Sequence, residues 1–124
     1  MTDLFLDEFE KYTVVYKALS EQTRLKIMWL LYKIESKASV SEIISVFEIN
    51  QYNASKHLQI LRNAGLVYKI KDGRWVFYQR TPINDEFLEK VYQSVISIPE
   101  PLLKIEIERC RCLLQVRENK NKSK

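Results

Sequence analysis

The sequence is poor in the residues that interrupt helices. Its 124 residues include two glycines and three prolines. Because these residue types are the strongest breaks in regular structure, their scarcity predicts a mainly helical chain whose segments are separated by capping residues. A chain of this length can bury its own core without disulfides or metal, so we expect one domain over residues 1–124.

Long apolar runs are also missing, and none approaches the roughly 18 residues that a membrane-spanning helix needs. The N-terminal stretch MTDLFLDEFEKY is acidic and lacks the basic segment and the small-residue cleavage site of a secretory signal. We therefore expect a cytoplasmic protein without a membrane partner. Combinations typical of enzymes are absent as well: there is one histidine and no phosphate loop, nucleophile elbow or HExxH pair. We expect no catalytic residue and no enzymatic activity.

Charge is distributed unevenly along the chain, although the net charge is only +4. Residues 50–80 carry six basic and one acidic side chain, a net of +5, whereas residues 1–49 carry six basic and eight acidic ones. Concentrated positive charge favours binding to a polyanion, because each phosphate that a cation neutralises releases condensed counterions. A solvated basic face is the other interpretation of charge alone.

Two helices are predicted in the N-terminal third. The later of the two is capped by Ser20 and ends near Ile34. It is apolar nearly all round and should be central, with Trp29 in the core. The first helix ends near Leu19 and carries an apolar stripe at helical spacing. That stripe comprises Phe5, Phe9, Tyr12, Tyr16 and Leu19, broadened by Leu4, Leu6 and Val15.

A short helix, a second capped helix and a hairpin follow. Ser39 opens a capping-box pattern for a helix to about Phe47. Asn50 can cap the next helix, which Gly65 ends in a left-handed conformation. Segments rich in β-branched and aromatic residues then flank an Asp-Gly pair, which is a strong signal for a hairpin over residues 66–80. Trp75 is expected to pack within this hairpin, the wing. In the helix that Asn50 caps, the core positions are Ala54, His57, Leu58 and Leu61.

The C-terminal part is predicted to contain two more helices. Thr81 should cap a helix that begins at Pro82 and runs to about Ser97. A final helix over residues 102–116 has a wide apolar surface, and residues 119–124 are expected to form a frayed basic tail.

This order predicts a winged helix-turn-helix: a mainly α fold with a small β-hairpin wing. The helix-turn-helix covers residues 41–65 and the wing residues 66–80. In such units the second helix enters the major groove, where amide, hydroxyl and cationic groups pair with base edges, and wing cations meet phosphates. The predicted DNA-binding residues are Gln51, Tyr52, Asn53, Ser55, Lys56, Gln59 and Arg62 on the helix and Lys69, Lys71 and Arg74 on the wing.

Residues 15–80 contain a series of short motifs: Ala18-Leu19-Ser20, Thr23-Arg24-Leu25, Val40-Ser41-Glu42-Ile43, Ala54-Ser55-Lys56-His57-Leu58, Leu61 to Val67, Asp72-Gly73-Arg74 and Tyr78. Together they resemble the ArsR-type (ArsR/SmtB) winged-helix regulators. The resemblance implies a homodimer assembled through the first and last helices, residues 1–19 and 83–118. It also implies binding to an imperfect palindrome in double-stranded DNA and repression of transcription until an inducer binds. Two-fold symmetry suits half-sites about one helical turn apart.

The inducer is where the chain departs from that family. Many members bind thiophilic metals through a Cys-Val-Cys element, where this chain has Ser39 and Ser41, and others use histidines on the last helix, where it has none. Cys110 and Cys112 are the remaining soft ligands. Three interpretations of this pair stay open: packing, binding of a thiophilic metal or metalloid ion, and a redox role beside cationic neighbours. Residues two apart on a helix point about 200° apart, which argues against both ligating one ion within a regular helix.

Three alternatives remain beside a repressor that is derepressed through Cys110 and Cys112. One is an ArsR-like regulator without a metal site. Another is a winged-helix interaction module that does not bind DNA and acts through its apolar terminal helices. The third is another winged-helix family, such as the MarR type. The basic tract 50–80 argues against the interaction module, because a module that binds only protein has no need of cations on both the helix and the wing.

Overall fold

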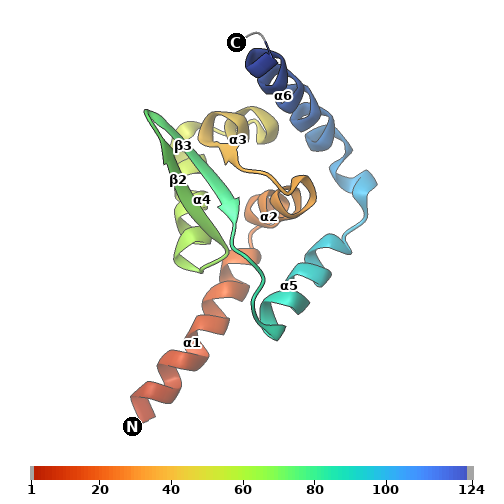
Figure 1. The fold of residues 1–124 in the computed structure, drawn as a ribbon. Coiled ribbons are helices and arrows are strands. Elements are labelled where there is room, and N and C mark those ends of the chain that lie inside the picture. Colours follow the sequence, from red (N-terminus) through yellow and green to blue (C-terminus); the bar gives the residue numbers. More distant parts are fainter. Residues whose placement is uncertain (1, 123–124) are drawn as a thin grey trace.

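The computed structural model describes the backbone of residues 2–122 and the side chains of residues 8–116. It is mainly helical with one small antiparallel sheet (Figure 1), which confirms the predicted fold class. In chain order the elements are α1 (Thr2–Leu19), α2 (Gln22–Ile34), β1 (Ala38–Ser39), α3 (Val40–Phe47), α4 (Gln51–Asn63), β2 (Val67–Asp72), β3 (Trp75–Arg80), α5 (Glu86–Ile96), the 3-10 helix η1 (Glu100–Leu103) and α6 (Lys104–Lys122).

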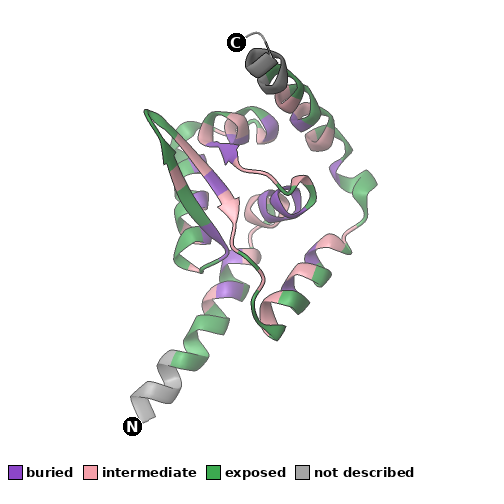
Figure 2. Ribbon diagram, in the orientation of Figure 1, coloured by how far each residue is buried: buried purple, intermediate pink, exposed green. Residues whose placement is uncertain are grey.

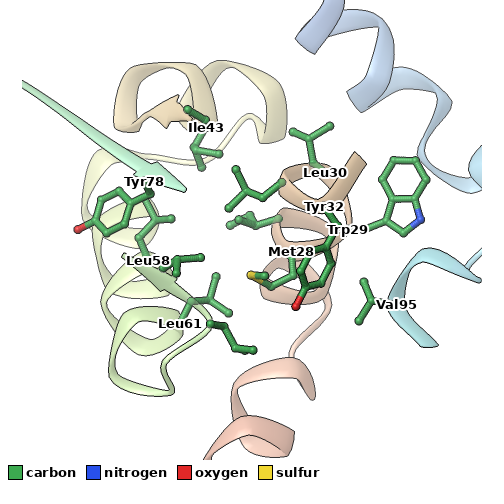
Figure 3. Packing of buried hydrophobic residues seen from close by; sticks show 14 of the residues in the cluster. Met28, Trp29, Leu30, Tyr32, Ile43, Leu58, Leu61, Tyr78 and Val95 are labelled. Carbon is green, nitrogen blue, oxygen red and sulfur yellow. The ribbon is translucent and has the colours of Figure 1, made fainter. Parts of the chain in front are cut away.

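Helix α2 is the centre of the core, as its nearly continuous apolar sequence predicts. All residues from Ile27 to Tyr32 are buried, and α2 packs against α1, α4 and α5. Figure 3 shows Leu58 and Leu61 of α4 pointing toward Met28 of α2. The buried Trp29 indole donates its N–H to the carbonyl of Ile98 at 3.1 Å, so burial leaves this polar group satisfied.

The sheet has the strand order β1-β3-β2, with both pairs antiparallel. Strands β2 and β3 form the predicted hairpin, in which Asp72 lies opposite Trp75 and Gly73 adopts a positive φ of 62°. The additional strand β1 pairs Ala38 with Tyr78. The sequence does not predict β1, because a strand of two residues has no periodicity of its own and its pairing with β3 is a long-range contact.

The predicted caps of α3 and α4 are confirmed. The Ser39 hydroxyl accepts from the Glu42 N–H at 3.1 Å, and the Glu42 carboxylate accepts from the Ser39 N–H at 2.8 Å, so the capping box is complete. The Asn50 amide oxygen accepts from the Asn53 N–H at 2.8 Å. Gly65 has φ 78°, the left-handed conformation expected after α4.

The predicted cap of α2 is wrong by one residue. Glu21 is the N-cap, and its carboxylate accepts from the Arg24 N–H at 3.0 Å. The Ser20 hydroxyl instead donates to the Lys17 carbonyl at 2.7 Å. It therefore satisfies the end of α1 rather than the start of α2.

The predicted start of α5 is also wrong. Thr81 does not cap a helix at Pro82, because its hydroxyl donates to the Gly65 carbonyl at 2.9 Å and closes the base of the wing. Helix α5 begins four residues beyond Pro82, at Glu86. Its N-cap is Asp85, whose carboxylate accepts from the Leu88 N–H at 2.8 Å.

The last helix is longer than the predicted 102–116. A 3-10 turn precedes α6, which continues to Lys122 and packs against α3. The predicted side-chain roles of residues 4–6 fall outside the part whose side chains are described. Of the predicted frayed tail, residues 119–122 have the helical backbone of the end of α6, and residues 123–124 lie outside the described residues. In the described part of the chain, no helix is both long and apolar enough to cross a bilayer.

Candidate DNA-binding surface

The turn between α3 and α4 has the geometry of a helix-turn-helix. Helix α3 ends at Glu48, which has φ 53° and whose N–H donates to the Ile44 carbonyl. The chain then runs through Ile49 to the Asn50 cap of α4. Ala54, Leu58 and Leu61 have no exposed surface and anchor α4 to the core. The opposite face of α4 is therefore held outward.

Every predicted DNA-binding residue lies on the molecular surface (Figure 2). Tyr52 at the start of α4 is 74% exposed. The Gln59 amide donates to the Asn63 amide oxygen at 2.9 Å, which adds Asn63 to the polar face. Asn63 is not among the residues predicted from the sequence, although its spacing of four residues from Gln59 is a usable signal. The exposed predicted residues on α4 are Gln51, Tyr52, Asn53, Ser55, Lys56, Gln59 and Arg62.

The hairpin β2–β3 carries the wing cations beside α4 (Figure 1). Lys69 lies opposite Tyr78 and Lys71 opposite Val76, and both lysines are exposed, as is Arg74 in the turn. Within the described side chains, no carboxylate forms an ion pair with Lys56, Arg62 or any of these wing cations. Their positive charge is therefore available to a polyanion.

Two aromatic residues of the wing, Trp75 and Tyr68, are exposed. Trp75 is 57% exposed rather than packed into the wing, because it directly follows the turn, where no other element covers it fully. Tyr68 is also exposed, and its hydroxyl donates to the Gln79 amide oxygen across the hairpin at 3.3 Å. Tyr68 and Gln79 are polar surface residues that the sequence analysis did not single out.

His57 lies on the inner side of α4, as predicted, but it is only partly buried. Its Nδ1 lies 3.2 Å from an Arg24 guanidinium nitrogen and 3.9 Å from a Glu21 carboxylate oxygen. Burial lowers the pKa of His57 below its ordinary 6.5; Glu21 opposes this shift, and Arg24 and Lys56 add to it. The imidazole is therefore neutral at pH 7.

The two cysteines are in different environments. Cys110 is buried beside a small apolar cavity between α2, α3 and α6, whereas Cys112 is exposed. Neither cysteine forms a disulfide bond. Among the described residues there is no group of three or more His, Cys, Asp or Glu side chains that could hold a metal ion. Because Cys110 is buried and Cys112 is exposed, the two thiols lie on different sides of α6.

Taken together, a short α3 anchored by the buried Ile43 and Val46, an outward polar face on α4 and a cationic hairpin define a winged helix-turn-helix protein of the DNA-binding class. Residues 21–69 match the family model described as "Bacterial regulatory protein, arsR family". The arsenical resistance operon repressor of Bacillus subtilis (strain 168) is 40% identical over 76 residues, which cover 61% of this chain and 69% of that protein. The chain belongs to the arsR family of bacterial regulatory proteins.

Solved structures agree with this assignment. HlyU from Vibrio cholerae N16961 is 30% identical with a TM-score of 0.60, over 71% of this chain and 90% of that one. The homodimeric winged helix-turn-helix DNA-binding domain Mb0332 from Mycobacterium bovis is 25% identical with a TM-score of 0.65, over 84% and 92% of the two chains. The matched segments span about two thirds of the length of curated relatives such as the B. subtilis repressor.

Proposed function

We propose that this protein is a DNA-binding transcriptional repressor that acts as a homodimer and reads an imperfect palindrome with α4 of each subunit. The observation that carries the proposal is the exposed polar face of α4 beside the exposed cationic side chains of the wing. Amides and hydroxyls on such a face suit base edges, and wing lysines suit phosphates. Repressors among its relatives, such as the arsenical resistance operon repressor, support this function.

Exposed apolar surface on α1 supports the homodimer. Phe9 is 71% and Tyr16 is 62% exposed, and α1 projects from the rest of the molecule (Figure 1). The Tyr16 ring contacts Phe87 of α5 with centroids 5.8 Å apart, so the aromatic surface continues onto α5. A contiguous apolar surface of this kind marks an interaction site. The homodimeric M. bovis domain supports the same assembly.

For the signal, we favour a repressor in which Cys110 and Cys112 of one subunit do not chelate a single ion. Cys110 faces the core and Cys112 faces solvent, so the two sulfurs diverge. Cys110 then serves in packing, and the exposed Cys112 thiol is the one open to a reagent. Release from DNA by arsenite or zinc that is lost in Cys110→Ser as well as in Cys112→Ser would contradict this assignment, because it would require both thiols.

The test is the affinity of the purified chain for duplexes that it selects from a random pool. The double variant Lys56→Glu/Arg62→Glu reverses two exposed charges on α4 and should abolish binding. The control Lys33→Glu reverses an exposed charge on α2, outside the reading face and the proposed dimer helices, and should leave most of the affinity intact. Binding by Lys56→Glu/Arg62→Glu as tight as that of the control would refute α4 as the reading helix, and absence of binding by the wild type would favour a module that does not bind DNA.

A further inference from the structure

The Arg24 side chain joins three helices. Its Nε donates to the Ala18 carbonyl at 2.7 Å, and one terminal nitrogen lies 3.5 Å from the Lys17 carbonyl. Both carbonyls belong to the last turn of α1, where backbone acceptors have no partner within the helix. The other terminal nitrogen lies 3.2 Å from Nδ1 of His57, at the middle of α4. One guanidinium therefore connects the end of α1 to the centre of the recognition helix.

The Arg24–His57 contact requires a particular state of the imidazole. A guanidinium has donors only, so Nδ1 of His57 must be the unprotonated acceptor and Nε2 must carry the proton. A hydrogen bond to a charged donor is stronger than one between neutral groups. Its loss would release the middle of α4 from the end of α1, while Ala54, Leu58 and Leu61 would still hold the helix to the core.

We propose that Arg24 and His57 are positioning residues that fix the recognition helix relative to α1, and that protonation of His57 weakens DNA binding by breaking their hydrogen bond. The inference rests on the proposed function, because α1 carries the proposed dimer surface. If two subunits meet through α1, the orientation of α4 against α1 sets the separation of the two reading helices.

The charged groups around His57 determine what protonation does. Within the described part of the chain these are Glu21 and Arg24 at the start of α2 and Lys56 on α4 itself; the other elements packed against α4, which are α1, α3 and β2, contribute no charged group that shifts the pKa of His57. A protonated ring places a second cation against the guanidinium. The Nδ1 atom, which then carries a proton, is 3.9 Å from an oxygen of the Glu21 carboxylate, which already caps α2. The ring therefore exchanges Arg24 for Glu21 as its partner, and the link to α1 is lost.

The direction of the pH effect follows from the lowered pKa of His57. Above pH 6.5 the ring is neutral in both the folded and the unfolded chain, so the contact is intact. As the pH falls below 6.5, the unfolded chain takes up the proton first, and the stability that the contact contributes declines until the folded ring is also protonated. DNA affinity should fall as the folded ring itself takes up the proton, which its lowered pKa places below pH 6.5.

The experiment uses the single histidine of the chain, because its NMR signals need no further assignment. At pH 7.5 the ring nitrogen shifts should show Nδ1 unprotonated and Nε2 protonated. In parallel, affinity for the selected duplex is measured at pH 7.5 and 5.5 at constant ionic strength. We expect the wild type to lose about tenfold in specific affinity at pH 5.5, a change of about 1.4 kcal/mol. Affinity for an unrelated duplex should not fall, because the added charge favours phosphates.

Two conservative variants separate positioning from a general structural role. His57→Asn retains an acceptor near the position of Nδ1 that does not titrate, so it should bind like the wild type at pH 7.5 and change less than twofold at pH 5.5. Arg24→Lys cannot serve α1 and α4 together and should bind about tenfold more weakly at pH 7.5, with little further loss at pH 5.5. Circular dichroism melting confirms that each variant is folded.

Distinct outcomes overturn the inference and the proposed function. A proton on Nδ1 at pH 7.5, or the same pH dependence in His57→Asn as in the wild type, refutes the inference while wild-type binding upholds the proposed function. If Arg24→Lys fails to fold, the ring tautomer and the His57→Asn profile still decide. Absence of any wild-type binding at pH 7.5 refutes the proposed function, and the inference with it.

Discussion

The dependence of DNA affinity on salt counts the phosphates that the protein neutralises, and a symmetric dimer doubles the effect of each substitution. Lys71 is exposed on the wing, opposite Val76, and no described carboxylate pairs with it. Each phosphate contact contributes about 0.9 to the slope of log K against log salt concentration. If Lys71 of each subunit contacts one phosphate, Lys71→Ala should reduce the slope by about 1.8 in a dimer and by about 0.9 in a monomer.

Fluorescence anisotropy of a labelled selected duplex, at salt concentrations from roughly 50 to 200 mM, gives the slope. Lys33→Ala is the matched control, since Lys33 is an exposed lysine of α2 outside α4, the wing and the proposed dimer helices. Its slope should equal that of the wild type. An unchanged slope for Lys71→Ala would show that the wing does not contact phosphates, and equal reductions in both variants would show a charge effect without a defined surface.

Four further substitutions test particular parts of the structure. Leu58→Ala removes a fully buried side chain of α4 and should lower the free energy of unfolding in urea by about 2–5 kcal/mol. Ser39→Ala removes the α3 cap and should cost about 1 kcal/mol in the same assay. Arg109→Ala removes a hydrogen bond to the Val46 carbonyl, so amide hydrogens at the end of α3 should exchange faster. Gln51→Ala should relax the base preference at one position of the selected sequence.

Each of these substitutions has a contradicting result. A loss below about 1 kcal/mol for Leu58→Ala would mean that α4 is not anchored through this residue. No loss for Ser39→Ala would show that the capping box is not formed in solution. Unchanged amide hydrogen exchange in Arg109→Ala would show that this contact from α6 does not stabilise the end of α3. An unchanged selected sequence for Gln51→Ala would remove this residue from the reading face.

Local signals were enough to predict the reading surface. The caps of α3 and α4, the apolar positions of α4 and the Asp-Gly turn are each encoded within a few residues, and the structure retains all of them. The winged helix-turn-helix follows from their order. The surface exposure of the predicted DNA-binding residues also follows, because the helical period separates them from the buried Leu58 and Leu61.

The remaining features depend on long-range contacts that no local pattern encodes. Strand β1 exists because β3 offers it a partner. Thr81 is a residue type that often caps helices, but its hydroxyl donates to the Gly65 carbonyl at the base of the wing. Helix α5 therefore starts later, at Glu86. The contact between Arg24 and His57 joins residues 33 positions apart. The burial of Cys110 depends on the docking of α6 against α3.

The most direct test of the central claim is selection of binding sites by the purified protein from a pool of random DNA duplexes, followed by sequencing. The account predicts an enriched inverted repeat whose half-site centres lie about one helical turn, roughly 10–11 base pairs, apart. Enrichment should disappear with Lys56→Glu/Arg62→Glu. A pool without any enriched sequence, or with one unrepeated site, would contradict paired reading of DNA by α4.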